Sequence, residues 1–193
     1  PNDVTRGSMK NVWWRCSKEP SHEWQTLVYS RGVKRTGCPF CRSLKVCQSN
    51  SLATTCPELA KEWHPNRNKK LTPNDVTRGS TKKVWWIFPI DPSHEWESAV
   101  GNRGSNGRGC PYCTGRQACS SNCLASLRPD IAKEWHKSKN GCLTAKEVTT
   151  GSNKRVWWIC SKDSKHQWQA RIIARCTNNT GCPHCWRLRL AGE

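Results

Sequence analysis

Cysteine and histidine residues recur along the chain at a spacing that suits a metal ion. Two segments carry the pattern Cys-x5-His-x15-Cys-x2-Cys, and the second lies two periods of 72 residues after the first. In structural zinc sites four such ligands surround the ion as a tetrahedron and leave no position open for a substrate. The sequence therefore predicts two closed Zn²⁺ sites. The predicted ligands are Cys16, His22, Cys38 and Cys41 in the first set and Cys160, His166, Cys182 and Cys185 in the second.

The copy between these two sets is incomplete. It keeps His94, Cys110 and Cys113, but Phe88 stands where the other copies have their first cysteine. Either the site is lost or weakly occupied, with Phe88 filling it as core, or three ligands hold zinc with water or Asp91 as the fourth. We favour the first interpretation, so a third zinc is not counted. A zinc ion with three protein ligands and a water could also catalyse hydrolysis. The sequence offers no nucleophile paired with a base and no phosphate-binding loop, so we expect the protein not to be an enzyme.

The fourteen cysteines could instead form the disulfides of a secreted protein. Cysteine pairs with two residues between them, each with a histidine at a fixed distance, favour metal binding in a reducing compartment. That compartment would be the nucleus, the cytoplasm, an organelle interior or a virion. No apolar run approaches the roughly 18 residues of a transmembrane helix. The sequence starts inside a repeat, so a targeting signal would not be visible. The other cysteines are interpreted as small thiols rather than ligands: Cys47, Cys56, Cys119, Cys123, Cys142 and Cys176.

The predicted ligands need elements that bring distant segments together. Residues 10–16 and 22–28 alternate in polarity, which predicts two strands of a hairpin around the turn 17–21. Cys16 and His22 then meet at the hairpin tip, and the tight turn 38–41 presents two more sulfurs. The same reasoning places hairpins at 83–100 and 155–173. A basic loop is expected after each hairpin, at 31–35, 103–108 and 171–179, and the first two of these contain glycine.

Short helices are predicted before the second and third hairpins, at 57–64 and 129–136. Each starts with proline followed by an acid, and Leu59 and Trp63 share one face. We expect each helix to pack its tryptophan on the next hairpin, with His64 and His136 as helix-dipole or packing groups rather than ligands. His184 lies in the last turn and is expected to point to solvent, and residues 186–190 suggest a last helical turn.

The expected fold is therefore three small α+β modules, each a β-hairpin plus a Cys-Pro-x-Cys turn stapled by zinc and joined by short helices. The predicted boundaries are 1–44, 45–116 and 117–193, and the middle segment carries the degenerate site.

Several motifs together resemble a known family. They are Leu59-Ala60-Lys61-Glu62-Trp63-His64-Pro65, Asn74-Asp75-Val76-Thr77, Val84-Trp85-Trp86, His94-Glu95-Trp96 and Gly109-Cys110-Pro111-Tyr112-Cys113. They are similar to the tandem treble-clef, zinc-ribbon-like repeat domain of unknown function found in large DNA viruses, bacteria, algae and protists. The resemblance covers nearly the whole chain. It implies zinc on the Cys-His-Cys-Cys set and no established activity. Phe88 departs from the pattern, and the turn before the histidine is longer than the family's.

The charge balance points to an anionic partner. Lys and Arg total 32 against 14 acids, a formal net charge of +18, which favours nucleic acid, an anionic surface or an acidic protein. If the basic side chains near the hairpins and before the cysteine pairs share one face, they could hold the phosphates of DNA or RNA with little sequence specificity. These candidates are Lys10, Arg15, Arg31, Lys34, Arg35, Lys82, Lys83, Arg103, Arg108, Lys154, Arg155, Arg171 and Arg175.

The tandem tryptophans allow two interpretations. Trp13, Trp85 and Trp157 should face opposite to Trp14, Trp86 and Trp158, so the outer row could stack on bases. The interpretation we favour is that both rows are core. The alternative function is that of a structural subunit in a large assembly, bound to protein, RNA or lipid. A small-molecule substrate is not expected.

Overall fold

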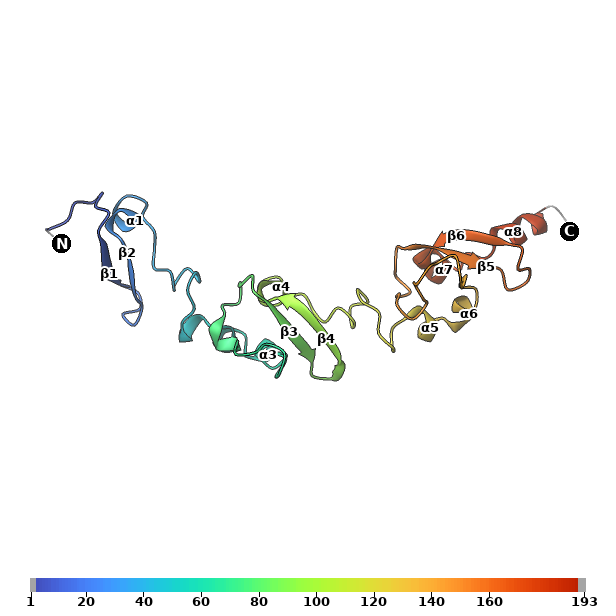
Figure 1. The fold of residues 1–193 in the computed structure, drawn as a ribbon, viewed down its shortest axis with the longest axis horizontal. Coiled ribbons are helices and arrows are strands. Elements are labelled where there is room, and N and C mark those ends of the chain that lie inside the picture. Colours follow the sequence, from blue (N-terminus) through green and yellow to red (C-terminus); the bar gives the residue numbers. More distant parts are fainter. Residues whose placement is uncertain (1–2, 191–193) are drawn as a thin grey trace. The chain divides into compact units, whose positions relative to one another are not determined.

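The computed structural model describes residues 3–190 and divides the chain into two compact units, residues 1–108 and 109–193. Within them lie three separate two-stranded antiparallel sheets, labelled in Figure 1. The strands are Asn11–Arg15 (β1) with Glu23–Leu27 (β2), Lys83–Phe88 (β3) with Asp91–Ala99 (β4), and Arg155–Ile159 (β5) with Gln167–Arg171 (β6). Three small modules, each a hairpin with a Cys/His cluster and short helices, therefore make up the fold, as predicted.

The same register repeats in all three hairpins. Trp14 faces Trp24, Trp86 faces Trp96, and Trp158 faces Trp168 across the strands. The indole nitrogen of each first tryptophan also donates to a carbonyl of the opposite strand, 3.1 to 3.2 Å away. The alternation of side chains buries this row in the second and third hairpins, where Trp86 and Trp158 are fully buried.

A short helix follows each hairpin, where the sequence predicted a basic loop. These helices are Val28–Gly32 (α1), Val100–Gly104 (α4) and Ile172–Thr177 (α7). Their first residues, Val28, Val100 and Ile172, are buried and anchor each helix on the hairpin. A side chain at Gly32 would lie 2.6 Å from the carbonyl oxygen of Arg6, so the glycine permits close contact with the preceding loop. The prediction of loops overlooked these anchors because basic residues surround them.

The connectors contain shorter helices than predicted. After a 3-10 turn at Gln48–Asn50 (η1), the helices are Leu52–Thr55 (α2) and Pro57–Ala60 (α3), with Pro73–Asp75 (η2) before the second hairpin. Leu124–Leu127 (α5) and Pro129–Ala132 (α6) are their counterparts before the third hairpin. The predicted helices at 57–64 and 129–136 thus end four residues early. Trp63 and Trp135 instead form β-bridges to Trp86 and Trp158.

The core of the third module shows how connector and hairpin combine. Leu124 and Ile131 of the connector, with Trp135, pack against Val156 and Trp158 of the hairpin. Trp135 meets Trp158 edge to face, with ring centroids 5.6 Å apart. The expectation that the connector tryptophan packs on the next hairpin is confirmed, although it does so from an extended segment. The last helix, Pro183–Leu190 (α8), already begins inside the final Cys-Pro-x-Cys turn.

Candidate metal centres

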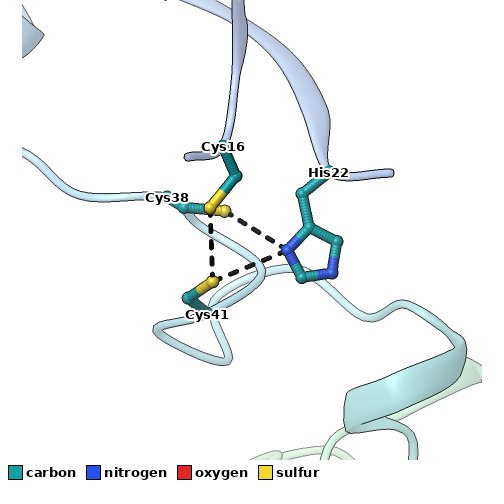
Figure 2. Close-up of side chains that lie close together, drawn as sticks. All are labelled: Cys16, His22, Cys38 and Cys41. Carbon is teal, nitrogen blue, oxygen red and sulfur yellow. Dashed lines mark hydrogen bonds between the residues drawn. The ribbon is translucent and has the colours of Figure 1, made fainter. Parts of the chain in front are cut away.

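The first predicted ligand set comes together at one point. Cys16 and His22 flank the turn at the tip of the β1–β2 hairpin, and Cys38 and Cys41 lie in the turn that follows α1. Figure 2 shows the three sulfurs and the imidazole Nδ1 of His22 turned toward one another. All four ligand atoms lie within 4.8 Å of one another.

The distances in this cluster fit a zinc ion. Sγ of Cys16 is 3.6 Å from Sγ of Cys41, and Nδ1 of His22 is 3.6 Å from the sulfurs of both Cys38 and Cys41. Tetrahedral zinc with Zn–S bonds of about 2.3 Å places its ligand atoms about 3.5 to 3.8 Å apart. A disulfide would need its sulfurs about 2.05 Å apart. All fourteen cysteines of the chain are free thiols.

The second set repeats this geometry in the third module. Cys160 Sγ lies 3.6 Å from Cys185 Sγ, and His166 Nδ1 lies 3.5 Å from Cys185 and 3.8 Å from Cys182. The amide of Lys162 also donates to the Cys160 sulfur at 3.4 Å. Donor type, number and spacing are thus the same in the two outer modules, and both fit a structural zinc.

Within each tetrad the pKa of one thiol is lowered and that of another is raised. A hydrogen bond from the Glu19 backbone, with others from Lys18 and neighbouring thiols, outweighs burial and lowers the pKa of Cys16 to about 7. Contact with the Cys16 sulfur, together with burial, raises the pKa of Cys41 to about 11. In the third module burial opposes ionisation of Cys160, but the amides of Lys162 and Asp163 lower its pKa overall. The contact with Cys160 raises the pKa of Cys185 to about 11. In the absence of metal, the ionisation of one thiol makes the ionisation of its neighbour less favourable. A bound divalent ion would remove this conflict, because it stabilises every thiolate at once.

The middle copy is a partial group. His94, Cys110 and Cys113 offer ligand atoms within 4.8 Å of one another. Asp91 is not part of that group, and its carboxylate lies 3.3 Å from Nε2 of His94. The ring of Phe88 lies over His94 with centroids 6.1 Å apart, which agrees with the interpretation of Phe88 as packing. Asp91 is therefore placed to orient the histidine rather than to act as the fourth ligand.

The second ring nitrogen, Nε2, of each ligand histidine also has a partner. Nε2 of His166 lies 3.4 Å from Asp163, as Nε2 of His94 does from Asp91, and carboxylates in this position orient metal-binding imidazoles. In the first module the thiol of Cys47 takes this place, 3.3 Å from Nε2 of His22. Cys47 thus lies beside the ligand set, on the opposite side of the His22 ring from Cys38 and Cys41. The sequence signal for this contact is an acidic residue three positions before each ligand histidine: Glu19, Asp91 and Asp163.

In the first and third modules, the residue before the last cysteine of the Cys-Pro-x-Cys turn stacks on the ligand histidine. Phe40 stacks on His22 with ring centroids 5.0 Å apart. His184 stacks on His166 at the same separation and is exposed, as the sequence predicted. His64 and His136 are not ligands either. They accept hydrogen bonds from the following backbone amides at Nδ1 and contact Glu95 and Gln167 through Nε2, so they act as packing groups.

A family comparison agrees with this geometry. The family described as a probable treble clef zinc finger domain matches residues 1–44, 59–116 and 131–188. The chain belongs to this family. It carries three treble clef repeats, of which the first and third hold complete zinc-binding tetrads and the second a partial one. No curated protein matches the chain at a significant level. Among residues 3–190, no helix has the length and apolar character needed to cross a membrane.

The basic candidates separate into two groups. Arg103 and Arg175 are buried, 8% and 5% exposed, and Arg31 is half-buried. Each guanidinium lies between two tryptophan rings of its own hairpin, 5.0 to 5.4 Å from the ring centroids. These three arginines are core groups that hold the hairpin together, so they do not belong on a phosphate-binding face. The remaining candidates are exposed: Lys10, Arg15, Lys34, Arg35, Lys82, Lys83, Arg108, Lys154, Arg155 and Arg171.

The outer tryptophan row is half covered. A cation stacks on Trp85 and on Trp157, with Arg67 and Lys139 each 4.5 Å from the ring centroid. Trp13 is 68% exposed. In the second and third repeats the inner tryptophans, Trp86 and Trp158, are buried, as predicted. The outer ones, Trp85 and Trp157, are only half-buried under a cation, so the interpretation of both rows as core holds for the inner row alone.

Proposed function

We propose that the chain is a non-enzymatic zinc-binding repeat protein that binds DNA or RNA through the phosphate backbone, with little sequence specificity. The observation that carries this proposal is a pair of arginines on the third hairpin. Arg155 and Arg171 face each other directly across β5 and β6. Like charges in this position oppose pairing of the strands unless an anion lies between or above them.

Further cations surround this pair. Lys154 precedes Arg155, and Lys139 lies over Trp157 on the face that Arg155 and Arg171 share. Within the described chain, residues 3–190, neither arginine takes part in an ion pair. This face is therefore positively charged, carries an aromatic ring and has no acid to neutralise it, which is the combination that single-stranded nucleic acid prefers.

A cavity of about 630 Å³ in the same unit, which Lys154 also lines, adds two cations. Arg116, Lys146 and Lys154 line it, and neither Arg116 nor Lys146 was among the residues predicted from sequence. The one acid in the lining, Glu147, accepts hydrogen bonds from the amide and hydroxyl of Thr144 at 2.8 and 3.0 Å. Phosphate oxygens in this cavity would lie close to the positive charges of all three side chains.

The other two hairpins are less suited to this role. In the second hairpin, Glu95 and Glu97 occupy the outer face, and Glu95 pairs with Arg67 at 2.8 Å. In the first, Arg15 is neutralised by Glu23 at 2.7 Å. We therefore assign the main phosphate contacts to the third repeat, with support from exposed Lys82 and Lys83 in the second.

Binding to random-sequence DNA and RNA, single-stranded and double-stranded, tests the proposal. Fluorescence anisotropy on the zinc-loaded chain should show tight binding at low salt that weakens steeply as salt is raised. Absence of binding at low salt would reject the proposal. It would leave the second candidate function, a structural subunit of a large assembly that binds protein, RNA or lipid partners, which exposed Trp13 favours.

A further inference from the structure

The outer faces of the second and third hairpins differ in charge. Three positions related by the 72-residue offset account for the difference: Glu95 and Gln167, Glu97 and Gln169, and Ala99 and Arg171. Each replacement adds one positive charge to the third hairpin. When the cation over the outer tryptophan and the first residue of the hairpin are included, the second face has two acids and two cations, Arg67 and Lys83. The third face has no acid in the part of the chain that the structure describes, and three cations, Lys139, Arg155 and Arg171.

The same replacements change how the outer tryptophan is covered. In the second repeat, Arg67 lies 4.5 Å from the ring centroid of Trp85, and Glu95 holds it there through an ion pair of 2.8 Å. In the third repeat, Lys139 lies 4.5 Å from the ring centroid of Trp157, but a glutamine stands at the position of that glutamate. Within residues 3–190, Lys139 forms no ion pair. This exposed lysine can therefore leave the ring without breaking a charge pair.

The ring of Trp157 is the centre of a small platform on the hairpin. Arg155 projects from the same face because residues two apart on a strand share a face, about 7 Å from each other. Arg171 lies directly opposite Arg155, and Gln169 lies opposite Trp157. The half-buried ring thus has two guanidinium groups at one end and the Lys139 ammonium above it. A ligand that carries both a planar ring and neighbouring anionic groups suits this arrangement.

We propose that this platform, formed by Trp157, Lys139, Arg155 and Arg171, binds single-stranded nucleic acid, with one base stacked on the indole and the adjoining phosphates held by the cations. In a duplex the faces of each base are covered by its neighbours, so only an unpaired strand offers a base to the ring. Stacking of a base is worth more than an exposed cation–π contact, so the base displaces Lys139 toward a phosphate.

This inference rests on the proposed function and adds a preference for single strands to it. Stacking and charge are common to DNA and RNA, and every base has an aromatic face, so neither sugar type nor base sequence is selected by the platform. The second hairpin lacks the same capacity, because Glu95 keeps Arg67 over Trp85 and adds negative charge beside the ring.

Competition between four anions tests the proposal on the full zinc-loaded chain. The labelled probe is an oligothymidylate of about ten nucleotides. The competitors are oligouridylate, duplex DNA and inorganic polyphosphate, which has no bases, each at the same phosphate concentration. At about 0.2 M salt, where charge attraction is weakened, both single strands should bind at least about tenfold more tightly than duplex or polyphosphate, because only they supply a stacked base.

A matched pair of tryptophan variants locates the stacking contact. Trp157→Leu keeps an apolar side chain but removes the aromatic face, so it should weaken single-strand binding about tenfold and leave polyphosphate binding unchanged. Trp85→Leu is the same change at the equivalent position of the second hairpin and should leave both affinities unchanged. Native mass spectrometry should show the same zinc content in the two variants.

A second pair avoids any change to the aromatic groups. Gln169 and Gln25 are both exposed and lie opposite the outer tryptophans of the third and first hairpins. Gln169→Glu should weaken single-strand binding about fivefold, as expected for one exposed charge interaction. Gln25→Glu gives the chain the same net charge and should leave the affinity unchanged.

The contrary outcomes separate this inference from the proposed function. Duplex binding as tight as single-strand binding, or single-strand binding that Trp157→Leu leaves intact, would overturn the inference and leave phosphate binding standing. An equal loss of polyphosphate binding in Trp157→Leu, or equal losses in Gln169→Glu and Gln25→Glu, would likewise show that the platform does not stack a base. Absence of binding to all four anions at low salt would reject the proposed function and the inference together.

Discussion

The carboxylate of Glu62 pairs with the guanidinium of Arg103, which lies between the rings of Trp86 and Trp96. Glu134 and Arg175 form the same arrangement in the third repeat. A connector and the helix after the hairpin are thereby joined through a charge pair that is largely shielded from water. Removing one partner of such a pair leaves an uncompensated charge in the core.

Glu62→Gln should therefore destabilise the second repeat by about 3–5 kcal/mol. Glu58→Gln in the same connector is the matched control, because Glu58 is exposed and its pair with Lys61 should be worth about 0–1 kcal/mol. Urea unfolding of the zinc-loaded chain, followed by tryptophan fluorescence, measures both. Equal effects of the two substitutions would show that Arg103 is not held as described.

Zinc stoichiometry separates complete clusters from the partial one. Native mass spectrometry should find two tightly bound zinc ions, and Cys16→Ser and Cys160→Ser should each remove one, because the tetrahedral set loses a ligand. Phe88→Cys should add a tightly bound zinc by restoring the spacing of the other copies. Three tight zinc ions in the unaltered chain would instead show that His94, Cys110 and Cys113 suffice.

The pH dependence of zinc affinity follows from the thiol pKa values. Ligand thiols must lose their protons to bind zinc, so affinity should fall as pH falls. With its pKa lowered to about 7, Cys16 is already a thiolate above that pH in the metal-free cluster, and below it one more proton must be displaced for each zinc bound. A plot of the logarithm of affinity against pH, measured by chelator competition, should thus become steeper below about pH 7 for the first site. A constant slope through this region would contradict the lowered pKa.

Chelation of zinc should unfold the outer repeats, because the metal joins the hairpin tip to a turn that is distant in sequence. A structural zinc contributes on the order of 10 kcal/mol to small domains. The near-ultraviolet circular dichroism of the tryptophans should collapse on addition of a strong chelator and return with zinc. A signal that survives chelation would mean that the tryptophan cores suffice without metal.

Arginine substitutions on the third hairpin test the proposed phosphate contacts. Arg155→Gln and Arg171→Gln should each weaken binding to all nucleic-acid sequences and lower the salt slope by about one. Neither should unfold the hairpin, since removing one of two facing like charges relieves repulsion. Lys18→Gln, an exposed change at the tip of the first hairpin, is the control. Equal losses in all three variants would indicate diffuse charge rather than this face.

The zinc tetrads could be predicted from the sequence because they depend on spacing alone. Cys16 and His22 must meet if residues 10–28 form a hairpin, and the cysteine pair needs only a tight turn. The strand pairs were also predictable, since tandem tryptophans at fixed positions mark an alternating pattern. The packing of the connector on the hairpin was harder to predict. Trp63 contacts the hairpin from an extended segment that forms a β-bridge, and not from the helix that begins at Pro57.

The role of the buried arginines could not be predicted from their charge. Arg103 and Arg175 appear in sequence as part of a basic loop, and burial of a cation is normally costly. Only the fold shows that aromatic faces and a carboxylate 41 residues earlier compensate for that cost. The available signal was positional: Arg31, Arg103 and Arg175 recur at one offset, as do Glu62 and Glu134.

Each connector covers the hairpin that follows it, and this order has a consequence for synthesis on the ribosome. Leu124, Ile131 and Trp135 have emerged before Val156 and Trp158, and the cysteines that close the third core come last. Each core can therefore form as soon as its own Cys-Pro-x-Cys turn is available. The array can be completed one repeat at a time, in the direction of translation, with zinc capture as the final step in the first and third repeats.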